Sequence, residues 1–479
     1  MAKKETIRVR FAPSPTGMLH LGNVRTALMN YLFAKKQNGD FVLRIEDTDP
    51  NRIFDKDGAQ IIKDLLWFGL DYNEGPNKDG AYAPYIQSQR AKIYQEKLNE
   101  LIEKNLVYRC FCTQEELDAK RKRQIALKLP PRYDRQCAQL SAAEIKEKLD
   151  AKKPFIWRMK LDPNKKIIIN DLAHGTITFN LKHFSDFPLT RQNGTFTFMF
   201  ANFVDDMIMN MSHVLRGEDH LSNTAGQAAL YQAFNVPLPV FWHLPIICNT
   251  TGKKLSKRDF GFALDDLRTA GYLPEALVNY LAIIGGGKFD HEIMSLDELA
   301  QNMHFDHMAS TGHVRYDPEK LNWINHKWIQ RIDHERLVDL CLGYLVTEYP
   351  EANKLSREQL SDLIKHVKND LHTLKDINTE LQFYFVEPTI TFDKIAEHID
   401  DDQISACQRI IKENLDKIED PQQLVSHIKE DAKKNNVSIK NIFKFMRLAL
   451  TGLPNGPGIG ELIDMLGVET AVKRLVKLI

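Results

Sequence analysis

Two short segments of the chain carry residue types that could bind a phosphate-rich ligand. The first spans residues 10–23, where an apolar run gives way to a loop with prolines and glycines and then to a helical pattern. A helix that begins after such a loop offers free N–H groups and the positive end of its dipole to a phosphate. His20 can donate to a phosphate oxygen, and Gly22 lets a flat ring approach the backbone. A tight turn with a packed histidine explains these residues equally well.

The second segment is the loop 250–258, which carries Lys254, Lys257 and Arg258. Three cations within five residues, shortly after a glycine, could clamp a polyphosphate. Taken alone, such a run is more often a solvated surface. It follows an apolar, strand-like run at 241–247, and ligand sites of α/β proteins lie at the ends of such strands. That position favours the binding interpretation.

A third group consists of Cys110, Cys112 and Cys137, the last of which follows the second by 25 residues. Thiolates at this spacing could hold Zn²⁺ tetrahedrally if a fourth ligand is present. Free reduced thiols in a small core are the alternative. The other cysteines fall in apolar patterns and are expected in the core: Cys248, Cys341 and Cys407.

The elements that must position these groups follow an α/β order. Residues 7–11 and 41–45 are short strand-like runs, with a helical pattern from Asn23 up to Gly39 between them and another helix at 61–66. This order predicts a parallel sheet. The same pattern returns near residue 200, with a helix expected near 223. The stretch 85–190 differs in composition and is interpreted as an insertion, and the chain beyond about 320 is helical in pattern.

Composition excludes several classes of protein. The chain has 479 residues, of which 64 are basic and 64 acidic, so a globally basic nucleic-acid binder is excluded while a local basic face is not. The 43% hydrophobic and 27% charged residues are typical of a globular protein. No apolar run reaches the roughly 18 residues of a membrane span. Six cysteines and a start without a secretory signal favour a cytoplasmic protein in a reducing compartment, with no membrane partner.

Together, the two phosphate-binding segments resemble a known pair of motifs. Residues 20–23 look like the "HIGH" element of class I aminoacyl-tRNA synthetases, and residues 254–258 look like their "KMSKS" loop. More narrowly, the chain resembles the bacterial glutamyl-tRNA synthetases. This likeness extends over nearly the whole chain, through the segments 12–17, 44–49, 205–206, 215–220, 316–321 and 449–452.

The resemblance implies a fold class and an order of domains. We expect an α/β, Rossmann-like class I catalytic domain with an inserted acceptor-stem domain, followed by an all-α anticodon-binding region. The expected boundaries are 1–84 and 191–250 for the two catalytic halves, 85–190 for the insertion, 251–325 for the KMSKS-loop and stem-contact domain, and 326–479 for the anticodon region.

The resemblance also implies the reaction. Glutamate would be activated by ATP to glutamyl-adenylate and transferred to the 3′ end of tRNA(Glu), with charging of tRNA(Gln) as an open question. Mg²⁺ would bridge the phosphates. His20 and Lys257 would be catalytic. The family's ATP-binding positions fall on Thr16, Gly17, His20, Gly22, Lys254, Ser256, Lys257 and Arg258.

Glutamate is a dianion with one ammonium group, so guanidinium forks and a carboxylate are expected around it. The family's glutamate-binding positions fall on Arg10, Ser14, Glu46, Phe198, Asn202 and Arg216. Phe198 stands where a tyrosine is usual and cannot donate a hydrogen bond. A second departure is the run 285–287 of three glycines, where the family normally has a tryptophan.

Relatives also suggest how the cysteines and basic runs are used. In many of them three cysteines of the insertion bind zinc, and Tyr133 matches a cysteine–tyrosine variant of that site, whereas Gln139 replaces a histidine. The run 120–123 is a candidate acceptor-stem surface. Lysines of the helical region form a candidate anticodon surface: Lys433, Lys434, Lys440 and Lys444. Relatives are mostly monomers, so a monomer is expected.

Three alternatives remain beside this interpretation. Another enzyme of the same group, either a tRNA-modifying glutamyl enzyme or a glutaminyl-tRNA synthetase, is opposed by the long helical C-terminal region. A nucleotidyltransferase would normally be far shorter. An inactive RNA-binding paralogue is opposed by the intact His20, Lys257, Arg10 and Glu46.

Overall fold

The computed structural model describes residues 6–49, 54–256, 259–284, 289, 291–305 and 314–479. Contacts within the chain divide it into two compact units. The first comprises Met1–Asp266 and Val278–Asp317, and the second comprises Leu267–Leu277 and Pro318–Ile479.

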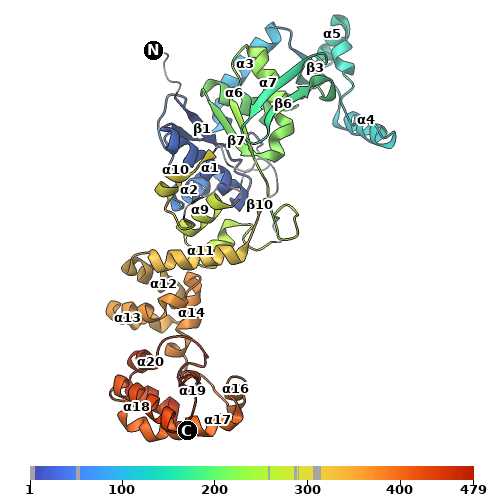
Figure 1. Ribbon diagram of the computed structural model, residues 1–479. Coiled ribbons are helices and arrows are strands. Elements are labelled where there is room, and N and C mark those ends of the chain that lie inside the picture. Colours follow the sequence, from blue (N-terminus) through green and yellow to red (C-terminus); the bar gives the residue numbers. More distant parts are fainter. Residues whose placement is uncertain (1–5, 50–53, 257–258, 285–288, 290, 306–313) are drawn as a thin grey trace. The chain divides into compact units, whose positions relative to one another are not determined.

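The first unit mixes strands and helices (Figure 1). Its strands are β1 (Arg8–Phe11), β2 (Asp40–Leu43), β3 (Val107–Cys110), β4 (Ile156–Met159), β5 (Lys166–Asp171), β6 (Gly175–Asn180), β7 (His213–Gly217), β8 (Val240–Leu244), β9 (Ile247–Cys248) and β10 (Val314–Arg315). Its helices, including two that cross into the second unit, are α1 (Leu21–Gln37), α2 (Ala59–Trp67), α3 (Ala91–Glu103), α4 (Gln114–Ala126), α5 (Ala142–Asp150), α6 (Phe198–Ile208), α7 (Leu221–Phe234), α8 (Leu264–Thr269), α9 (Pro274–Ile283) and α10 (Leu296–Asn302).

Each half of the predicted sheet contains a parallel pair of strands, and the two halves lie side by side. β1 pairs with β2, and β7 with β8, both in parallel. β1 also lies beside β7, since the backbone oxygen of Arg8 accepts a hydrogen bond from the N–H of Ser212 at 3.0 Å. The expected parallel α/β arrangement is therefore confirmed, and it brings together segments about 200 residues apart in the sequence.

Helix α1 begins two residues before the apolar pattern predicts, because His20 caps it. The Nδ1 atom of His20 accepts the N–H of Asn23, and the side chain of Asn23 accepts the N–H of His20, each at 3.3 Å. Such reciprocal capping satisfies N–H groups that the first turn leaves unpaired. The helix ends at Asn38, whose left-handed conformation (φ 52°) is tolerated well by asparagine. Its apolar face packs in the core.

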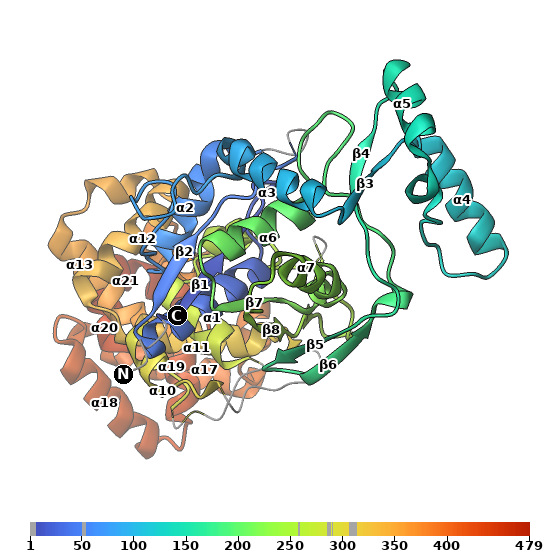
Figure 2. The ribbon, with the colours of Figure 1, turned by 90° about the horizontal axis from the view of Figure 1, so that it is seen from above.

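The range 85–190 contains two different structures. β3 pairs antiparallel with β4, and in Figure 2 this pair leads to α4 and α5, at a distance from the other helices of the unit. β5 and β6, in contrast, extend the second sheet, whose strand order is β6-β5-β8-β7. The composition of the sequence did not reveal this, because β5 lies far from its partner β8 along the chain.

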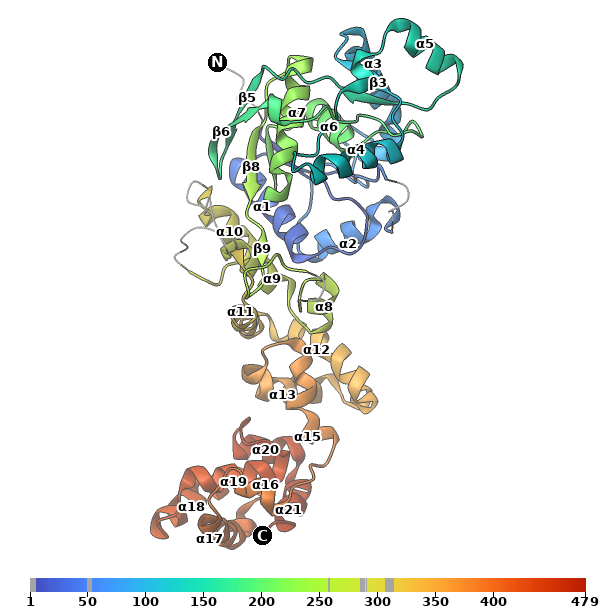
Figure 3. The ribbon, with the colours of Figure 1, turned by 90° about the vertical axis from the view of Figure 1, so that its right-hand side faces the viewer.

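The second unit contains only helices among its described residues, as the pattern beyond residue 320 predicts (Figure 3). Its α-helices are α11 (Pro318–Arg331), α12 (His334–Glu348), α13 (Arg357–Val367), α14 (Ile377–Glu380), α15 (Gln382–Phe385), α16 (Phe392–Ala396), α17 (Asp401–Asn414), α18 (Pro421–Lys434), α19 (Ile439–Thr451), α20 (Ile459–Leu466) and α21 (Val468–Val476). Cys341 and Cys407 are fully buried here, as expected of core residues. Across the described part of the chain, no helix is long and apolar enough to cross a membrane.

Candidate active site

His20 lies where β1 leads into α1, and its hydrogen bonds define its tautomer. Because Nδ1 accepts the N–H of Asn23, the proton of the neutral ring is on Nε2. Burial lowers the pKa of His20, and the positive charge of Lys254 lowers it further, so the ring is neutral near pH 7. The ring stacks on Phe262, with 4.8 Å between ring centroids. His20 can therefore donate from Nε2 at a helix N-terminus, which suits a phosphate oxygen.

Gly22 contributes differently from the sequence-based interpretation, in which it admits the flat ring of a ligand. A Cβ atom at this position would come within 3.0 Å of Cε1 and 3.1 Å of Nδ1 in the ring of His20. The space that glycine leaves open is thus occupied by the imidazole of the same chain. Gly22 allows His20 to fold back and cap the helix.

The loop from β1 to α1 also carries Ser14, Thr16 and Gly17, all of them exposed. The backbone N–H of Thr16 donates to the backbone carbonyl oxygen of Ser14 at 2.9 Å. The oxygen of Pro13 accepts the N–H of Glu46 at 2.9 Å. This bond joins the loop to the chain just after β2, so the loop lies beside Glu46.

The Lys254 loop faces the helix that begins after β7. Nζ of Lys254 lies 3.1 Å from a carboxylate oxygen of Asp219, with the two side chains 62% and 48% exposed. Ser256 donates to Asp259 from its backbone N–H and from its hydroxyl, each at 2.8 Å. An exposed ion pair such as Lys254–Asp219 contributes little to stability, so Lys254 can exchange Asp219 for a phosphate. The predicted Lys257 and Arg258 lie outside the described residues, as does the glycine run 285–287.

Glu46 is fully buried near the end of β2 and has one oxygen without a partner. Its Oε1 accepts hydrogen bonds from Arg44 at 2.8 Å, Asn202 at 2.7 Å and Gln87 at 3.3 Å. Its Oε2 has no hydrogen-bond partner among the described residues. Burial raises the pKa of Glu46, while the positive charge of Arg44 opposes that rise. A buried carboxylate oxygen with no partner is costly, and a donor from a ligand would relieve that cost.

A network of buried ion pairs surrounds Glu46. Three arginines are paired with three carboxylates: Arg10, Arg44 and Arg90 with Glu46, Asp205 and Asp206. The guanidinium of Arg10 contacts both oxygens of Asp206, at 3.0 and 3.1 Å. Although burial works in the opposite direction, Arg10 and Arg44 hold the pKa of Asp206 below its ordinary value. The charges of this network balance within the protein.

Arg216 is the exception, since it is buried but has no ion pair with a carboxylate of the described chain. Its Nε donates to His243 at 3.3 Å and its Nη2 to Thr224 at 2.7 Å, and both of these acceptors are neutral. Burial lowers the pKa of Arg216 to about 10, and the nearby Arg10 lowers it too. The guanidinium nevertheless stays charged near pH 7. The site therefore carries one uncompensated positive charge, which suits an anionic ligand.

Two more of the predicted pocket residues lie on α6. Asn202 lies beside Glu46, because its amide nitrogen donates to Glu46 and its oxygen accepts from Gln227 at 2.6 Å. Phe198 begins the helix and is half-buried, and its ring lies 5.8 Å from that of His220. The side chain at 198 thus presents an apolar ring beside His220. Of the three arginines of the buried network, Arg10 was singled out from the sequence as a binding residue; Arg44 was included only as part of the segment 44–49, and Arg90 was not named.

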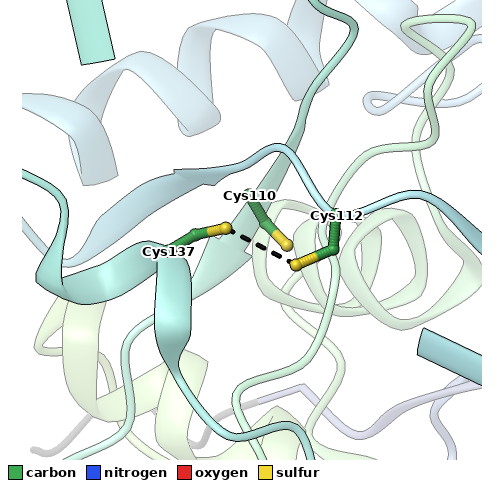
Figure 4. Close-up of side chains that lie close together, drawn as sticks. All are labelled: Cys110, Cys112 and Cys137. Carbon is green, nitrogen blue, oxygen red and sulfur yellow. Dashed lines mark hydrogen bonds between the residues drawn. The ribbon is translucent and has the colours of Figure 1, made fainter. Parts of the chain in front are cut away.

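The three cysteines of the insertion come together in a small buried cluster. Their Sγ atoms all lie within 4.8 Å of one another, and those of Cys112 and Cys137 are 3.6 Å apart. Figure 4 shows the three side chains pointing toward a common centre. Burial raises the pKa of Cys112 to about 12, and the neighbouring Cys110 contributes to that rise.

The hydroxyl of Tyr133 provides a fourth donor for this cluster. It lies 3.3 Å from Sγ of Cys110 and 3.7 Å from Sγ of Cys112. With a Zn–S distance near 2.3 Å, a tetrahedral site has edges of about 3.8 Å between sulfurs, which fits the spacing seen here. Gln139 is exposed at the end of its turn and is not needed to complete the set. The four side chains therefore fit a zinc ion.

The predicted RNA-binding runs both lie on helices. The run 120–123 is on α4, in which no residue is buried, and Lys120 is paired with Asp134 at 2.7 Å. In the second unit, Lys433 and Lys434 are in the last turn of α18, and Lys440 is exposed on α19. These surfaces offer cations to solvent. An RNA backbone would need such contacts.

Two family models cover most of the chain. The catalytic domain described as "tRNA synthetases class I (E and Q)" matches residues 6–323. The model described as "Anticodon binding domain" matches residues 336–479. The first accounts for the α/β unit with its insertion, and the second for most of the helical unit.

Individual proteins are similar over the full length. The glutamate–tRNA ligase of Finegoldia magna is 37% identical, covering 98% of this chain and 99% of the relative. That of Clostridioides difficile is 36% identical, with 98% of each chain covered. Among solved structures, a glutamate tRNA ligase from Elizabethkingia meningosepticum in complex with its amino acid has a TM-score of 0.87 and 32% identity, and a glutamate-tRNA synthetase from Elizabethkingia anophelis has 0.88 and 33%, each covering 99% of both chains.

Proposed function

The chain belongs to the class I glutamate–tRNA ligases, and on that basis we propose which of its side chains bind each substrate and support the reaction. The enzyme activates glutamate and transfers it to tRNA. In the first step a glutamate carboxylate attacks the α-phosphorus of ATP, giving glutamyl-adenylate and pyrophosphate. In the second, a hydroxyl of the terminal ribose attacks the activated carbonyl and AMP leaves. Catalysis therefore consists of positioning and charge stabilisation.

Glutamate binds in the buried pocket at Glu46 and Arg216. One observation carries this proposal: the pocket has a carboxylate oxygen without a donor, Glu46 Oε2, and a guanidinium without a counter-ion, Arg216. A substrate with one ammonium and two carboxylates supplies what both groups lack. Arg10 adds a second guanidinium with N–H groups beyond those that Asp206 uses. Asn202 fixes Glu46, and Ser14 and Phe198 line the pocket.

ATP binds at the N-terminus of α1 and the Lys254 loop. The Nε2–H of His20 donates to a phosphate oxygen, and Lys254 leaves Asp219 to contact the phosphates. Lys257 stabilises the charge that develops on pyrophosphate. The remaining family positions complete the nucleotide site: Thr16, Gly17, Gly22, Ser256 and Arg258. Mg²⁺, held by the phosphates, neutralises part of their charge.

One zinc ion binds to Cys110, Cys112, Tyr133 and Cys137 and stabilises the insertion. The spacing of the four donors supports this assignment. Metal analysis of the purified protein should find about one zinc per chain, and Cys112→Ser should lose it while Cys248→Ser keeps it. Absence of zinc from the wild-type protein, purified without chelator, would leave the cluster as a thiol core.

The RNA surfaces, the compartment and the assembly complete the proposal. tRNA contacts α4 with its acceptor stem and the lysines of α18 and α19 with its anticodon region. The enzyme works as a monomer in the cytoplasm, and the six unpaired cysteines suit a reducing compartment. Light scattering of the pure protein tests the assembly.

The decisive experiment is charging with labelled glutamate, ATP and Mg²⁺ on two purified transcripts, tRNA(Glu) and tRNA(Gln). We expect tRNA(Glu) to be charged. Charging of tRNA(Gln) as well would extend the substrate range to a misacylating enzyme. Charging of neither transcript, with ATP–pyrophosphate exchange also absent in the presence of tRNA, would contradict the proposal and favour an inactive RNA-binding protein.

A further inference from the structure

Arg216 is the end of a chain of buried hydrogen bonds that begins at Asp171. Oδ2 of Asp171 lies 2.5 Å from Nδ1 of His243, and Nε2 of His243 lies 3.3 Å from Nε of Arg216. The three residues lie on β5, β8 and β7, which are neighbours in one sheet, and Arg216 is directly opposite His243 in the register. His243 is completely buried. The sheet therefore connects an acidic residue outside the pocket to the cation inside it.

Asp171 determines which nitrogen of His243 carries the proton. Its Oδ1 accepts the N–H groups of Ala173 and His174 at 2.9 and 3.0 Å, and its Oδ2 accepts the backbone N–H of His243 at 3.2 Å. A carboxylate held by these donors remains ionised and only accepts, so Nδ1 of His243 must donate to it. Burial lowers the pKa of His243, so the ring is neutral. Nε2 therefore carries no proton; it accepts the Nε–H of Arg216 at 3.3 Å, and the hydroxyl oxygen of Thr224 lies 3.0 Å from it.

This arrangement orients Arg216 without neutralising it. A carboxylate in direct contact with the guanidinium would cancel its charge and compete with an anionic substrate. The imidazole separates Asp171 from Arg216, and the hydroxyl of Thr224 is a second neutral acceptor, 2.7 Å from Nη2. These two acceptors fix the plane of the guanidinium. Nη1 has no hydrogen-bond partner among the described residues and is left for a ligand.

We propose that Asp171 and His243 are positioning residues that hold Arg216 oriented and uncompensated, and so determine the preference for a carboxylate over an amide on the substrate side chain. The inference rests on the proposed role of Arg216 in glutamate binding. It assigns selectivity for glutamate against glutamine partly to residues that do not touch the substrate.

Two isosteric changes at His243 separate the two contacts of the imidazole. Glutamine places its amide near the position of Nε2 and can still accept from Arg216, whereas asparagine places its amide near Nδ1 and keeps only the bond to Asp171. We expect His243→Asn to raise the KM for glutamate about 10- to 100-fold, the usual effect of losing a hydrogen bond to a charged group. We expect His243→Gln to raise it less than about threefold, with kcat and the KM for ATP nearly unchanged in both.

A third variant tests the charge argument. His243→Glu places a carboxylate beside Arg216 and should lower the ratio of kcat/KM for glutamate over glutamine by about tenfold or more. If His243→Asn fails to fold, Thr224→Val removes the other neutral acceptor and should raise the KM for glutamate. All variants are assayed by ATP–pyrophosphate exchange with tRNA present.

The outcomes distinguish this inference from the proposed pocket. If Arg216→Ala raises the KM for glutamate but His243→Asn and Thr224→Val do not, the positioning role is wrong and the pocket stands. If Arg216→Ala has no effect on that KM, both proposals fail. If the asparagine and glutamine variants lose kcat and stability equally with no change in KM, His243 serves only the fold.

Discussion

The proposed nucleotide site and the proposed amino-acid pocket of the first unit are built in opposite ways. On the nucleotide side, His20 is held by its own helix and Lys254 by an exposed ion pair. In the proposed pocket, Glu46 is buried beside Arg44 and Asn202, and Arg216 is buried against the neutral side chains of His243 and Thr224, so these partners come from several strands and helices. The first region depends on local backbone geometry, and the second depends on the assembled sheet.

This difference has an energetic reason. Phosphates carry much charge and remain near solvent, so a helix N-terminus and a few exposed cations suffice for them. Selecting one amino acid requires charges that are fixed and shielded from water, where an unpaired group is costly. The buried network balances its own charges, and among the described residues it leaves Glu46 Oε2 without a donor and Arg216 without a counter-ion.

The strongest test of this contrast is Arg44→Met. Arg44 is completely buried between Glu46 and Asp206, so its loss leaves Glu46 without its cation and Asp206 paired with Arg10 alone. Removing one partner of a buried pair costs roughly 3–5 kcal/mol. Urea unfolding should show a loss of that size. The control is Lys78→Met at the exposed Lys78–Asp71 pair, which should cost less than about 1 kcal/mol; equal losses would contradict the distinction.

The next largest effect is expected from Arg216→Ala. Loss of a desolvated partner of a charge costs about 2–5 kcal/mol, so the KM for glutamate should rise roughly 30-fold or more. The KM for ATP should change little, because Arg216 belongs to the pocket alone. Steady-state exchange assays with each substrate varied measure both values. Equal saturation by glutamate in wild type and variant would remove Arg216 from the pocket.

A smaller effect is expected on the nucleotide side from Lys254→Ala. Its side chain is mostly exposed, so the free energy of unfolding should change by less than about 1 kcal/mol. The KM for ATP should rise several-fold, up to about tenfold. This difference between wild type and variant should become smaller with added salt, since screening acts on exposed charges. The glutamate KM serves as the internal control. A change in the glutamate KM as large as that in the ATP KM would show that the two regions are not separate.

The smallest expected effect is a pH dependence from His20. Burial lowers its pKa in the folded protein, so folding favours the neutral ring. The stabilisation is therefore complete above the unfolded pKa near 6.5 and is lost as the pH falls below it. His20→Asn keeps a capping oxygen but does not titrate. Melting curves at pH 8 and 5.5 should show wild type losing up to about 1 kcal/mol more than the variant; identical losses would contradict the assigned tautomer.

Local patterns made a phosphate site one of the open interpretations. The strand, the loop and the helix start at residues 10–23 are contiguous, and so is the cationic loop 254–258, but the family resemblance was needed to favour phosphate binding over a packed histidine and a solvated surface. For Gly22 the pattern suggested room for a ligand ring, whereas the structure places the ring of His20 there. The sequence cannot distinguish a ligand ring from the ring of His20, because either one requires a glycine, which has no Cβ atom, at position 22. The catalytic roles themselves stay predictions.

The amino-acid pocket could be predicted only through the family. Arg10, Glu46, Asn202 and Arg216 are far apart in the chain, and none has a local pattern that marks it as buried. The same is true of β5, which was assigned to the insertion by composition but pairs with β8. Strand pairing across such separations leaves no periodic signal.

The sequence by itself determined the class and order of the domains, because hydrophobic periodicity and helix or loop signals are local properties of the chain. The motifs and the resemblance determined the family. Only the tertiary structure decided which charges are balanced and which are left over, since that depends on distances between side chains from different strands. It is the sheet order β5-β8-β7 that places Asp171 and His243 behind Arg216 and leaves that cation uncompensated.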